Sequence, residues 1–221
     1  MSHFTPALLA RFRRARGGLA AVEFAFAVPL LLLILLGFYE LDRYVETTRQ
    51  LERAAAAVAQ MLTQTTTDVS RQDLVVATDS LRVLAPRVLQ DSARLGVDWK
   101  SGVQLGMTSV AFSTAPGCVS ACVYSAKVSW SAGTSRRPCN VSLTAVADNT
   151  EPGATTLPTD VYGPNGLVVV DLAYAYAPVF ATRLFHGFTI KRSAYLQPRY
   201  LKPATALAYA VPGGDDLVTA C

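Results

Sequence analysis

The sequence predicts an α+β fold, with a long N-terminal helix packed on a small antiparallel sheet of about four strands, and a second helix. Three observations predict it. An apolar run near the N-terminus continues into a segment with helical periodicity, a second helical stripe follows, and four later segments alternate apolar and polar residues. Because one face of such a sheet needs cover, we expect the amphipathic part of the first helix to supply it.

Residues 1–18 form a basic leader. It contains Arg11, Arg13, Arg14 and Arg16 and no acidic residue, and these arginines account for the whole net charge of +4. A nucleic-acid-binding protein needs a basic face on its folded part, so no nucleic-acid partner is predicted. Arginines directly before an apolar run are typical of the cytoplasmic side of a membrane segment. The leader therefore predicts that the N-terminus lies in the cytoplasm.

Residues 19–40 are predicted to form a transmembrane helix. From Leu19 to Tyr39 the chain is apolar except for Glu23, which matches the roughly 20 residues that cross a bilayer. A cleaved secretory signal is the alternative, but it needs small residues in an A-x-A-like pattern at its end. The run ends instead in LGFYEL. A retained helix is favoured, and it would leave residues 41–221 as an extracytoplasmic domain.

The extracytoplasmic domain is predicted to begin with the continuation of the same helix over residues 41–63. Apolar side chains recur there at the helical spacing i, i+3, i+4, i+7, and charged side chains lie between them. Ser70 followed by Asp73 is typical of a helix start and predicts a second helix over residues 71–89. Pro86 is expected to kink or shorten this helix, because proline lacks an N–H donor and clashes with the preceding turn.

Strands are predicted where apolar and polar residues alternate with a period of two. This pattern occurs near residues 103–112, 122–131, 166–176 and 188–197. Between the second and third of these, Gly, Pro, Ser, Thr and Asn are abundant, which predicts a long loop or an insertion.

Four cysteines follow the membrane segment, and an even number outside the cytoplasm predicts two disulfides. An eight-residue strand would lie between Cys122 and Cys139 and would cover about 26 Å. Disulfide-bonded Cα atoms lie within about 7 Å of each other. The favoured pairing is Cys118–Cys122 with Cys139–Cys221, while a loop that folds back after the strand would allow others. The alternative use, a metal site of three cysteines and His186, matches no familiar zinc spacing.

Catalytic motifs are not found in the sequence. It contains no G-x-S-x-G, no H-E-x-x-H and no Gly-rich phosphate loop, and only two histidines. We therefore expect no enzymatic activity, no cofactor and no small-molecule substrate.

The segment GGLAAVEFAFAVPLLLLILLGFYE resembles the N-terminus of the TadE-like pseudopilins, minor subunits of the tight-adherence (Flp) pilus system within the type IV pilin superfamily. The family pattern is a basic leader, a Gly, four residues, a Glu followed by an aromatic residue, and an apolar helix containing Pro. Here Gly18, Glu23, Phe24 and Pro29 occupy these places. The resemblance covers residues 11–62 and, less closely, residues 167–200.

The resemblance implies that a prepilin peptidase cuts between Gly18 and Leu19. Leu19 would then carry a free α-amine, and the resemblance implies that Glu23 pairs with such an amine, either its own or that of a neighbouring subunit. Only a matched charge makes a buried carboxylate tolerable in the bilayer. The alternative is that Glu23 lies at the bilayer surface and reaches the water. Pro29 is expected to bend the helix.

The resemblance implies a minor pilin-like subunit of the inner membrane that takes part in assembly of a Flp/Tad-type pilus. Its partners would be the membrane, the prepilin peptidase, other pseudopilins and pilus assembly proteins. TadF-like subunits share the leader, so the subclass stays open, as does a place at the start, at the tip or in a periplasmic complex. The alternative function is a single-pass protein that displays a binding or sensing domain and never enters a filament.

Overall fold

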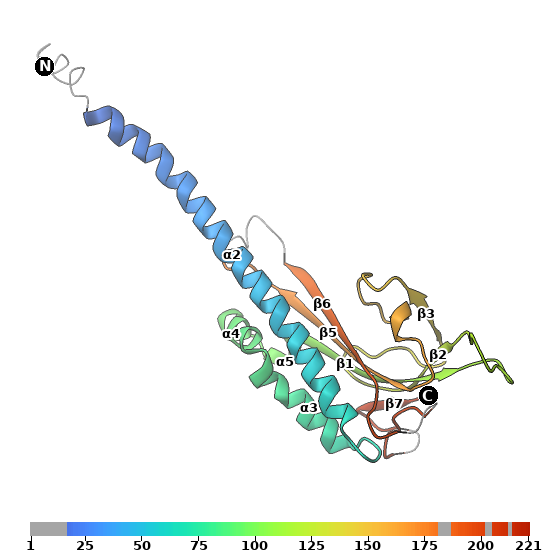
Figure 1. The fold of residues 1–221 in the computed structure, drawn as a ribbon. Helices are drawn as coiled ribbons and strands as arrows, with labels where there is room; N and C mark the ends of the chain where they lie inside the picture. The colour runs from blue at the N-terminus through green and yellow to red at the C-terminus, as the bar shows by residue number, and fades with distance from the viewer. Residues whose placement is uncertain (1–16, 181–186, 202–204, 212–213) are drawn as a thin grey trace, which may run out of the picture. The chain divides into compact units, whose positions relative to one another are not determined.

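The computed structural model describes residues 17–180, 187–201, 205–211 and 214–221. The chain divides into two compact units, Met1–Arg43 and Tyr44–Cys221, and each is described by itself. The predicted α+β class is confirmed: helices occupy the first part of the chain and a sheet the second (Figure 1).

One long helix, α2 (Gly17–Thr63), supplies all the described structure of the first unit and continues into the second. Within the first unit its large apolar side chains are exposed, among them Phe24, Phe26 and Leu33. The helix is long and apolar enough to cross a membrane. In length and composition it therefore has the properties predicted for residues 19–40.

In the second unit, α2 packs on the sheet through a stripe of small and branched residues. The side chains of Leu51, Ala54, Ala55, Val58, Ala59 and Leu62 are all almost completely buried and belong to one core cluster with strand residues. Alanines at this spacing let the helix backbone approach the sheet closely. The predicted cover of one sheet face by the outer half of the helix is thus confirmed.

The predicted helix over residues 71–89 is wrong as a single element. Two helices are present, α3 (Arg71–Leu84) and α4 (Pro86–Leu95). Ser70 caps α3 through a reciprocal capping box with Asp73, as the sequence indicates. Of the two effects expected of Pro86, shortening is confirmed, since α3 ends at Leu84. Pro86 also starts the new helix, because its missing N–H has no cost at a first helical position.

A left-handed glycine ends α4, and a short helix leads into the sheet. Gly96 has φ +67°, a conformation that favours glycine and that terminates helices. The single turn α5 (Trp99–Gly102) follows and runs directly into the first strand.

The four predicted strands form the centre of the sheet, with limits within a few residues of those expected. They are β1 (Val103–Ser113), β2 (Ser125–Gly133), β5 (Leu167–Tyr176) and β6 (Phe188–Leu196). Each pairs antiparallel with its neighbour in the order β2-β1-β5-β6.

The sheet is larger than predicted and is mixed, because three short strands join it. They are β3 (Ser142–Val146), β4 (Thr156–Pro158) and β7 (Val218–Ala220), which bring the described sheet to seven strands. β3 and β4 pair in parallel, whereas β7 pairs antiparallel with β2. Strands of three to five residues among Gly, Pro and Thr leave too few alternating positions to be recognised in sequence.

The segment predicted as a long loop covers the second face of the sheet. Leu143 of β3 and Leu157 of β4 pack with Val110, Phe112 and Val169 in a core cluster separate from the one under α2. β5 therefore lies between two apolar layers, which explains why its sequence begins with an almost continuous apolar run.

Candidate functional site

The residues predicted to carry function lie at the start of α2. Gly18 and Leu19 lie in its first turn, since the helix begins at Gly17. The leader arginines Arg11, Arg13, Arg14 and Arg16 lie outside the described residues, as does His186. The helix is therefore continuous from the predicted cleavage position onward.

Glu23 is exposed on α2 and is surrounded along the helix by exposed apolar side chains. Phe24, its neighbour, is 68% exposed, and Glu23 has no ion-pair partner among the residues that the structure describes. Residues four apart lie on the same side of a helix, so Leu19 and Glu23 share one face. A charge on Leu19 would thus lie one turn from the carboxylate.

Pro29 lies within α2, and the helix continues through it without interruption. Proline is tolerated within membrane helices in general, because neighbouring groups and local adjustments satisfy the freed carbonyl. Glu23, Phe24 and Pro29 thus belong to one continuous helix.

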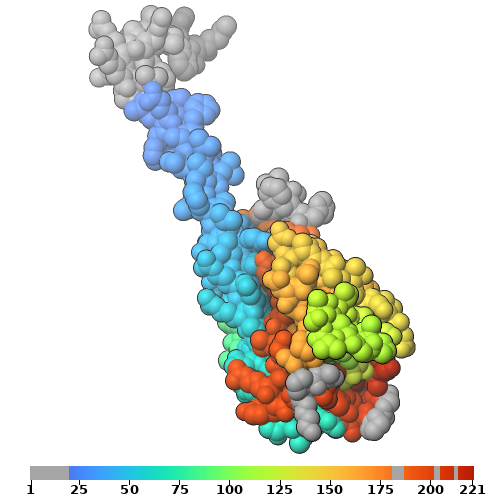
Figure 2. Space-filling model, turned by 45° about the vertical axis from the view of Figure 1, so that its right-hand side comes forward, coloured from blue at the N-terminus to red at the C-terminus, as the bar shows by residue number. Residues whose placement is uncertain are grey.

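Both predicted disulfides are present in the second unit. Cys118 bonds to Cys122 and Cys139 bonds to Cys221, with Cα separations of 5.8 Å and 5.2 Å. The first closes the loop between β1 and β2, visible as the lime-green lobe on the surface (Figure 2). The second ties the C-terminal residue to the segment that follows β2. No described residues form a cluster of His, Cys, Asp or Glu that could hold a metal ion.

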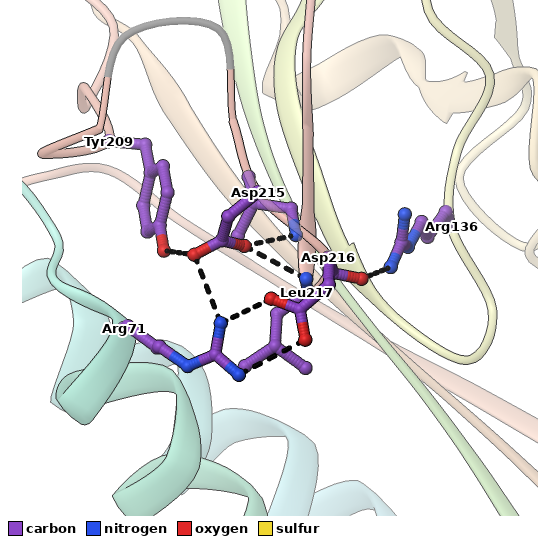
Figure 3. Close-up of polar contacts among 7 residues, drawn as sticks. Arg71, Arg136, Tyr209, Asp215, Asp216 and Leu217 are labelled. Atoms are coloured by element: carbon purple, nitrogen blue, oxygen red, sulfur yellow. Dashed lines mark hydrogen bonds and ion pairs between the residues drawn. The ribbon is translucent and has the colours of Figure 1, made fainter.

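A polar cluster fixes the C-terminal segment to the start of α3, and we name Arg71, Tyr209, Asp215 and Asp216 the C-terminal clasp (Figure 3). Arg71 forms a two-pronged ion pair with Asp216 and also contacts Asp215 at 3.3 Å. The Tyr209 hydroxyl donates to Asp215 at 2.7 Å. The other Asp215 oxygen accepts the backbone N–H groups of Leu217 and Val218 at 2.8 and 3.0 Å.

These contacts shift the pKa values of three side chains in the clasp. The hydrogen bond from Tyr209 lowers the pKa of Asp215, and the hydrogen bond from Arg71 lowers the pKa of Asp216, both below the usual 3.8. Removal from water, together with the hydrogen bond to Asp215, raises the pKa of Tyr209 to about 12. The folded state thus favours the two carboxylates and the neutral phenol.

Acid is expected to open the clasp. Because the folded-state pKa values of both aspartates lie below the unfolded value of 3.8, their stabilisation is complete above that pH. It is lost as the pH falls through the folded values. Hydrogen–deuterium exchange at the amides of Leu217 and Val218, corrected for intrinsic rates, should therefore accelerate below about pH 4. Asp215→Asn should show faster exchange already at pH 7, and equal exchange in this variant and the wild type would contradict the clasp.

Sequence reasoning missed a second ion pair, which lies on the sheet face that β3 and β4 cover. The side chain of Arg137 is only 1% exposed, and its guanidinium binds Asp171 through two hydrogen bonds of 2.7 and 3.0 Å. A third donor reaches the Thr156 carbonyl at 2.7 Å, and Ser193 also donates to Asp171. The sequence gives one sign of this pair, because Asp171 is the single carboxylate in the otherwise apolar β5. Its partner Arg137 could not be identified, since it comes from a segment that the sequence predicts to be a loop.

Surface hollows lie beside β6, away from the start of α2. Two hollows, of about 490 and 350 Å³, are lined among others by Lys191 and by the Arg137–Asp171 pair. Lys191 is itself paired with Glu151 at 3.0 Å. Arg137 is likewise paired with Asp171, and the predicted functional residues all lie on the N-terminal part of α2, which stays the candidate site.

Comparison with known proteins identifies this part of the chain. Residues 18–60 match the family model described as TadE-like protein. No curated protein and no solved structure matches the chain. The matched range begins at Gly18 and includes Glu23, Phe24 and Pro29, so the resemblance noted in the sequence is confirmed there, while residues 167–200 lie outside it.

Proposed function

Since residues 18–60 are a TadE-like segment, we propose that this protein is a minor pilin-like subunit that takes part in assembly of a Tad (Flp) pilus. The observation that carries the proposal is the first part of α2, where an apolar surface without any buried side chain surrounds one carboxylate. Such a surface needs lipid or other helices as its surroundings. The membrane supplies the first before assembly, and packed helices of other subunits supply the second afterwards.

The anchor sits in the inner membrane with the leader arginines in the cytoplasm and the second unit outside. The positive-inside bias supports this orientation. The two disulfides support it as well, because disulfides persist in oxidising compartments such as the periplasm. In this arrangement the protein performs no reaction; it is the substrate of a prepilin peptidase and a part of an assembly.

The peptidase removes the leader between Gly18 and Leu19, and the new α-amine of Leu19 becomes the partner of Glu23. The helical spacing supports this pairing, since the amine and the carboxylate lie on one face about one turn apart. The same geometry lets the amine of a neighbouring subunit approach Glu23. Either arrangement replaces an isolated carboxylate in an apolar environment by a matched pair.

Leader removal is the direct test of this function. Mass measurement of the protein from cells that contain the peptidase should find Leu19 as the first residue. The cut is expected there because Gly18, the residue directly before it, has no side chain to obstruct the peptidase. Gly18→Val should retain the leader. Gly37→Ala is the matched control, since its new Cβ meets no atom within 4 Å, and it should be cut like the wild type.

Two outcomes would contradict the proposal. An intact leader in these cells would favour a membrane-anchored binding or sensing domain instead of a pilus subunit. A new N-terminus beyond residue 40 would indicate a secretory signal and would remove the anchor altogether.

A further inference from the structure

The strand β6 has one edge without a neighbouring strand. It pairs antiparallel with β5 from Phe188 to Leu196, and it ends the strand order β4-β3-β2-β1-β5-β6 (Figure 1). No other strand in the described part of the chain pairs with its outer side. Because the backbone groups of successive strand residues point to opposite sides, about half of the N–H and C=O groups of β6 point away from β5. A row of backbone donors and acceptors is therefore open to a further strand.

This edge lacks most of the features that usually prevent the addition of a strand. Edge strands are commonly short, bulged or interrupted by proline. The other end of the sheet follows this rule, since β4 has three residues and ends at Pro158. In contrast, β6 has nine residues without proline, and its register with β5 is continuous. Its protection consists of two cationic side chains, Lys191 and Arg192.

A surface hollow of about 490 Å³ lies along this edge, and we name it the β6 groove. It is lined by residues 188–193 of β6, by residues 148–152 between β3 and β4, and by Tyr44. Successive side chains of a strand point to opposite faces of the sheet, so both faces of β6 contribute to the groove. A hollow that is lined by both faces of an edge strand reaches around that edge. Every lining residue belongs to the second unit, so the groove is formed within one compact body.

The groove has a wall on each face of the sheet, and each wall contacts the strand. The ring centroid of Tyr44 lies 5.5 Å from that of Phe188, and Glu151 binds Lys191 at 3.0 Å. Phe188 and Lys191 are three positions apart, so they lie on opposite faces of β6. The free edge thus lies between two walls, a shape that fits an extended segment of polypeptide.

One cation of the groove has no carboxylate partner. Lys191 is paired with Glu151, and the other carboxylate of the wall, Asp148, accepts the backbone N–H of Asp160 at 3.1 Å. Arg192 forms no ion pair with any residue that the structure describes. Its Nη1 donates to the Lys191 carbonyl at 2.7 Å, which leaves further guanidinium donors available. The groove therefore favours an occupant that brings a carboxylate to Arg192.

We propose that the β6 groove binds an extended, carboxylate-bearing segment of another protein, which adds to the sheet as a strand beside β6. In strand addition the backbone hydrogen bonds supply affinity, and the side chains on either face supply specificity. A second copy of this chain fits less well. Antiparallel pairing of two copies about the middle of β6 would set Lys191 and Arg192 against the same cations, and like charges opposite each other on paired strands are destabilising.

Two synthetic peptides test the groove in the full-length protein in detergent. Each has nine residues, to match β6, with alternating Thr and Val, blocked ends and a central residue that is either Glu or Lys. Anisotropy of the labelled peptides measures affinity, and hydrogen–deuterium exchange locates the site. The Glu peptide should bind more tightly than the Lys peptide. It should also slow exchange within residues 188–196 while leaving β2, which has neighbours on both sides, unchanged.

Substitution of Arg192 tests the recognition of the carboxylate. Arg192→Gln should bind the Glu peptide about fivefold more weakly, the upper value for an exposed ion pair, whereas Arg192→Lys should retain most of the affinity. Arg53→Gln is the matched control, because Arg53 is exposed on α2 outside the groove, and it should bind like the wild type. An unchanged exchange pattern for peptide-free Arg192→Gln shows that the sheet is intact.

Three outcomes would overturn the proposal. The first is a lack of protection of β6 at millimolar concentrations of the Glu peptide. The second is equal affinity of the Glu and Lys peptides for the wild type. The third is a dimer, detected by sedimentation without peptide, in which β6 is protected, because a second copy would then be the occupant. None of these outcomes bears on leader removal, so the proposed function would stand.

Discussion

Glu23→Gln is expected to remove the subunit from assembled pili while leaving it in the membrane with its leader cut. Under the proposed function, the carboxylate neutralises an α-amine inside a bundle of apolar helices. Loss of one partner of a buried pair costs about 3–5 kcal/mol, which corresponds to roughly a hundred- to four-thousand-fold loss of assembled subunit. Insertion should persist, because a neutral amide is less costly in lipid than a carboxylate. Immunoblots of sheared pili and of membranes would measure the two pools.

Glu52→Gln is the matched control for this substitution. Glu52 is an exposed carboxylate on the same helix, but it lies beyond the apolar run, where water can solvate it. Its replacement should leave both pools unchanged. Wild-type amounts of Glu23→Gln in sheared pili would refute the pairing role and favour a carboxylate that reaches the bilayer surface. Equal loss in both variants would point to a general effect of helix charge.

Asp171→Ala is expected to destabilise the second unit by about 3–5 kcal/mol, because it leaves the Arg137 guanidinium buried without its counter-ion. Arg137 is 1% exposed and donates two hydrogen bonds to Asp171. Urea unfolding of the detergent-solubilised chain, followed by fluorescence of Trp99 and Trp130, should show a lower midpoint.

Two further variants make this prediction specific. Asp98→Ala removes a carboxylate that caps no backbone group and should change the midpoint little. Arg137→Met combined with Asp171→Ala removes both charges, and it should recover part of the loss because no unpaired charge remains. A change below about 1 kcal/mol for Asp171→Ala would show that the pair acts like one on the surface.

Local features of the sequence were sufficient for the elements with long, regular patterns. The helical stripe from Tyr44 to Leu62 indicates which face of α2 is buried, and alternation locates β1, β2, β5 and β6. These predictions succeed because each residue's burial there follows from its position within one repeating element. The proline at residue 86 shows the limit of such reasoning. The sequence predicts a kinked or a shortened helix there, and the structure has the shortened one. That a second helix starts at the proline itself was not predicted.

Contacts between distant segments could not be predicted in the same way. β3 and β4 are strands because Leu143 and Leu157 find an apolar face to cover, not because their own sequence alternates. Arg71 meets Asp216 across 145 positions of the chain, and neither residue carries a local signal of the other. The segment between β2 and β5, which the sequence predicts to be a loop, therefore forms strands only through the residues that it packs against.

The sequence by itself determined that residues 19–40 are long and apolar enough to cross a membrane, the α+β class and the positions of Gly18, Glu23 and Pro29 within a segment that matches the TadE-like family model. These follow from composition and spacing along one continuous stretch of chain. Only the tertiary structure decided the second apolar layer, the Arg137–Asp171 pair and the C-terminal clasp. Each of these brings together residues from separate segments, and the free energy of such contacts depends on burial and distances that arise only when the sheet forms.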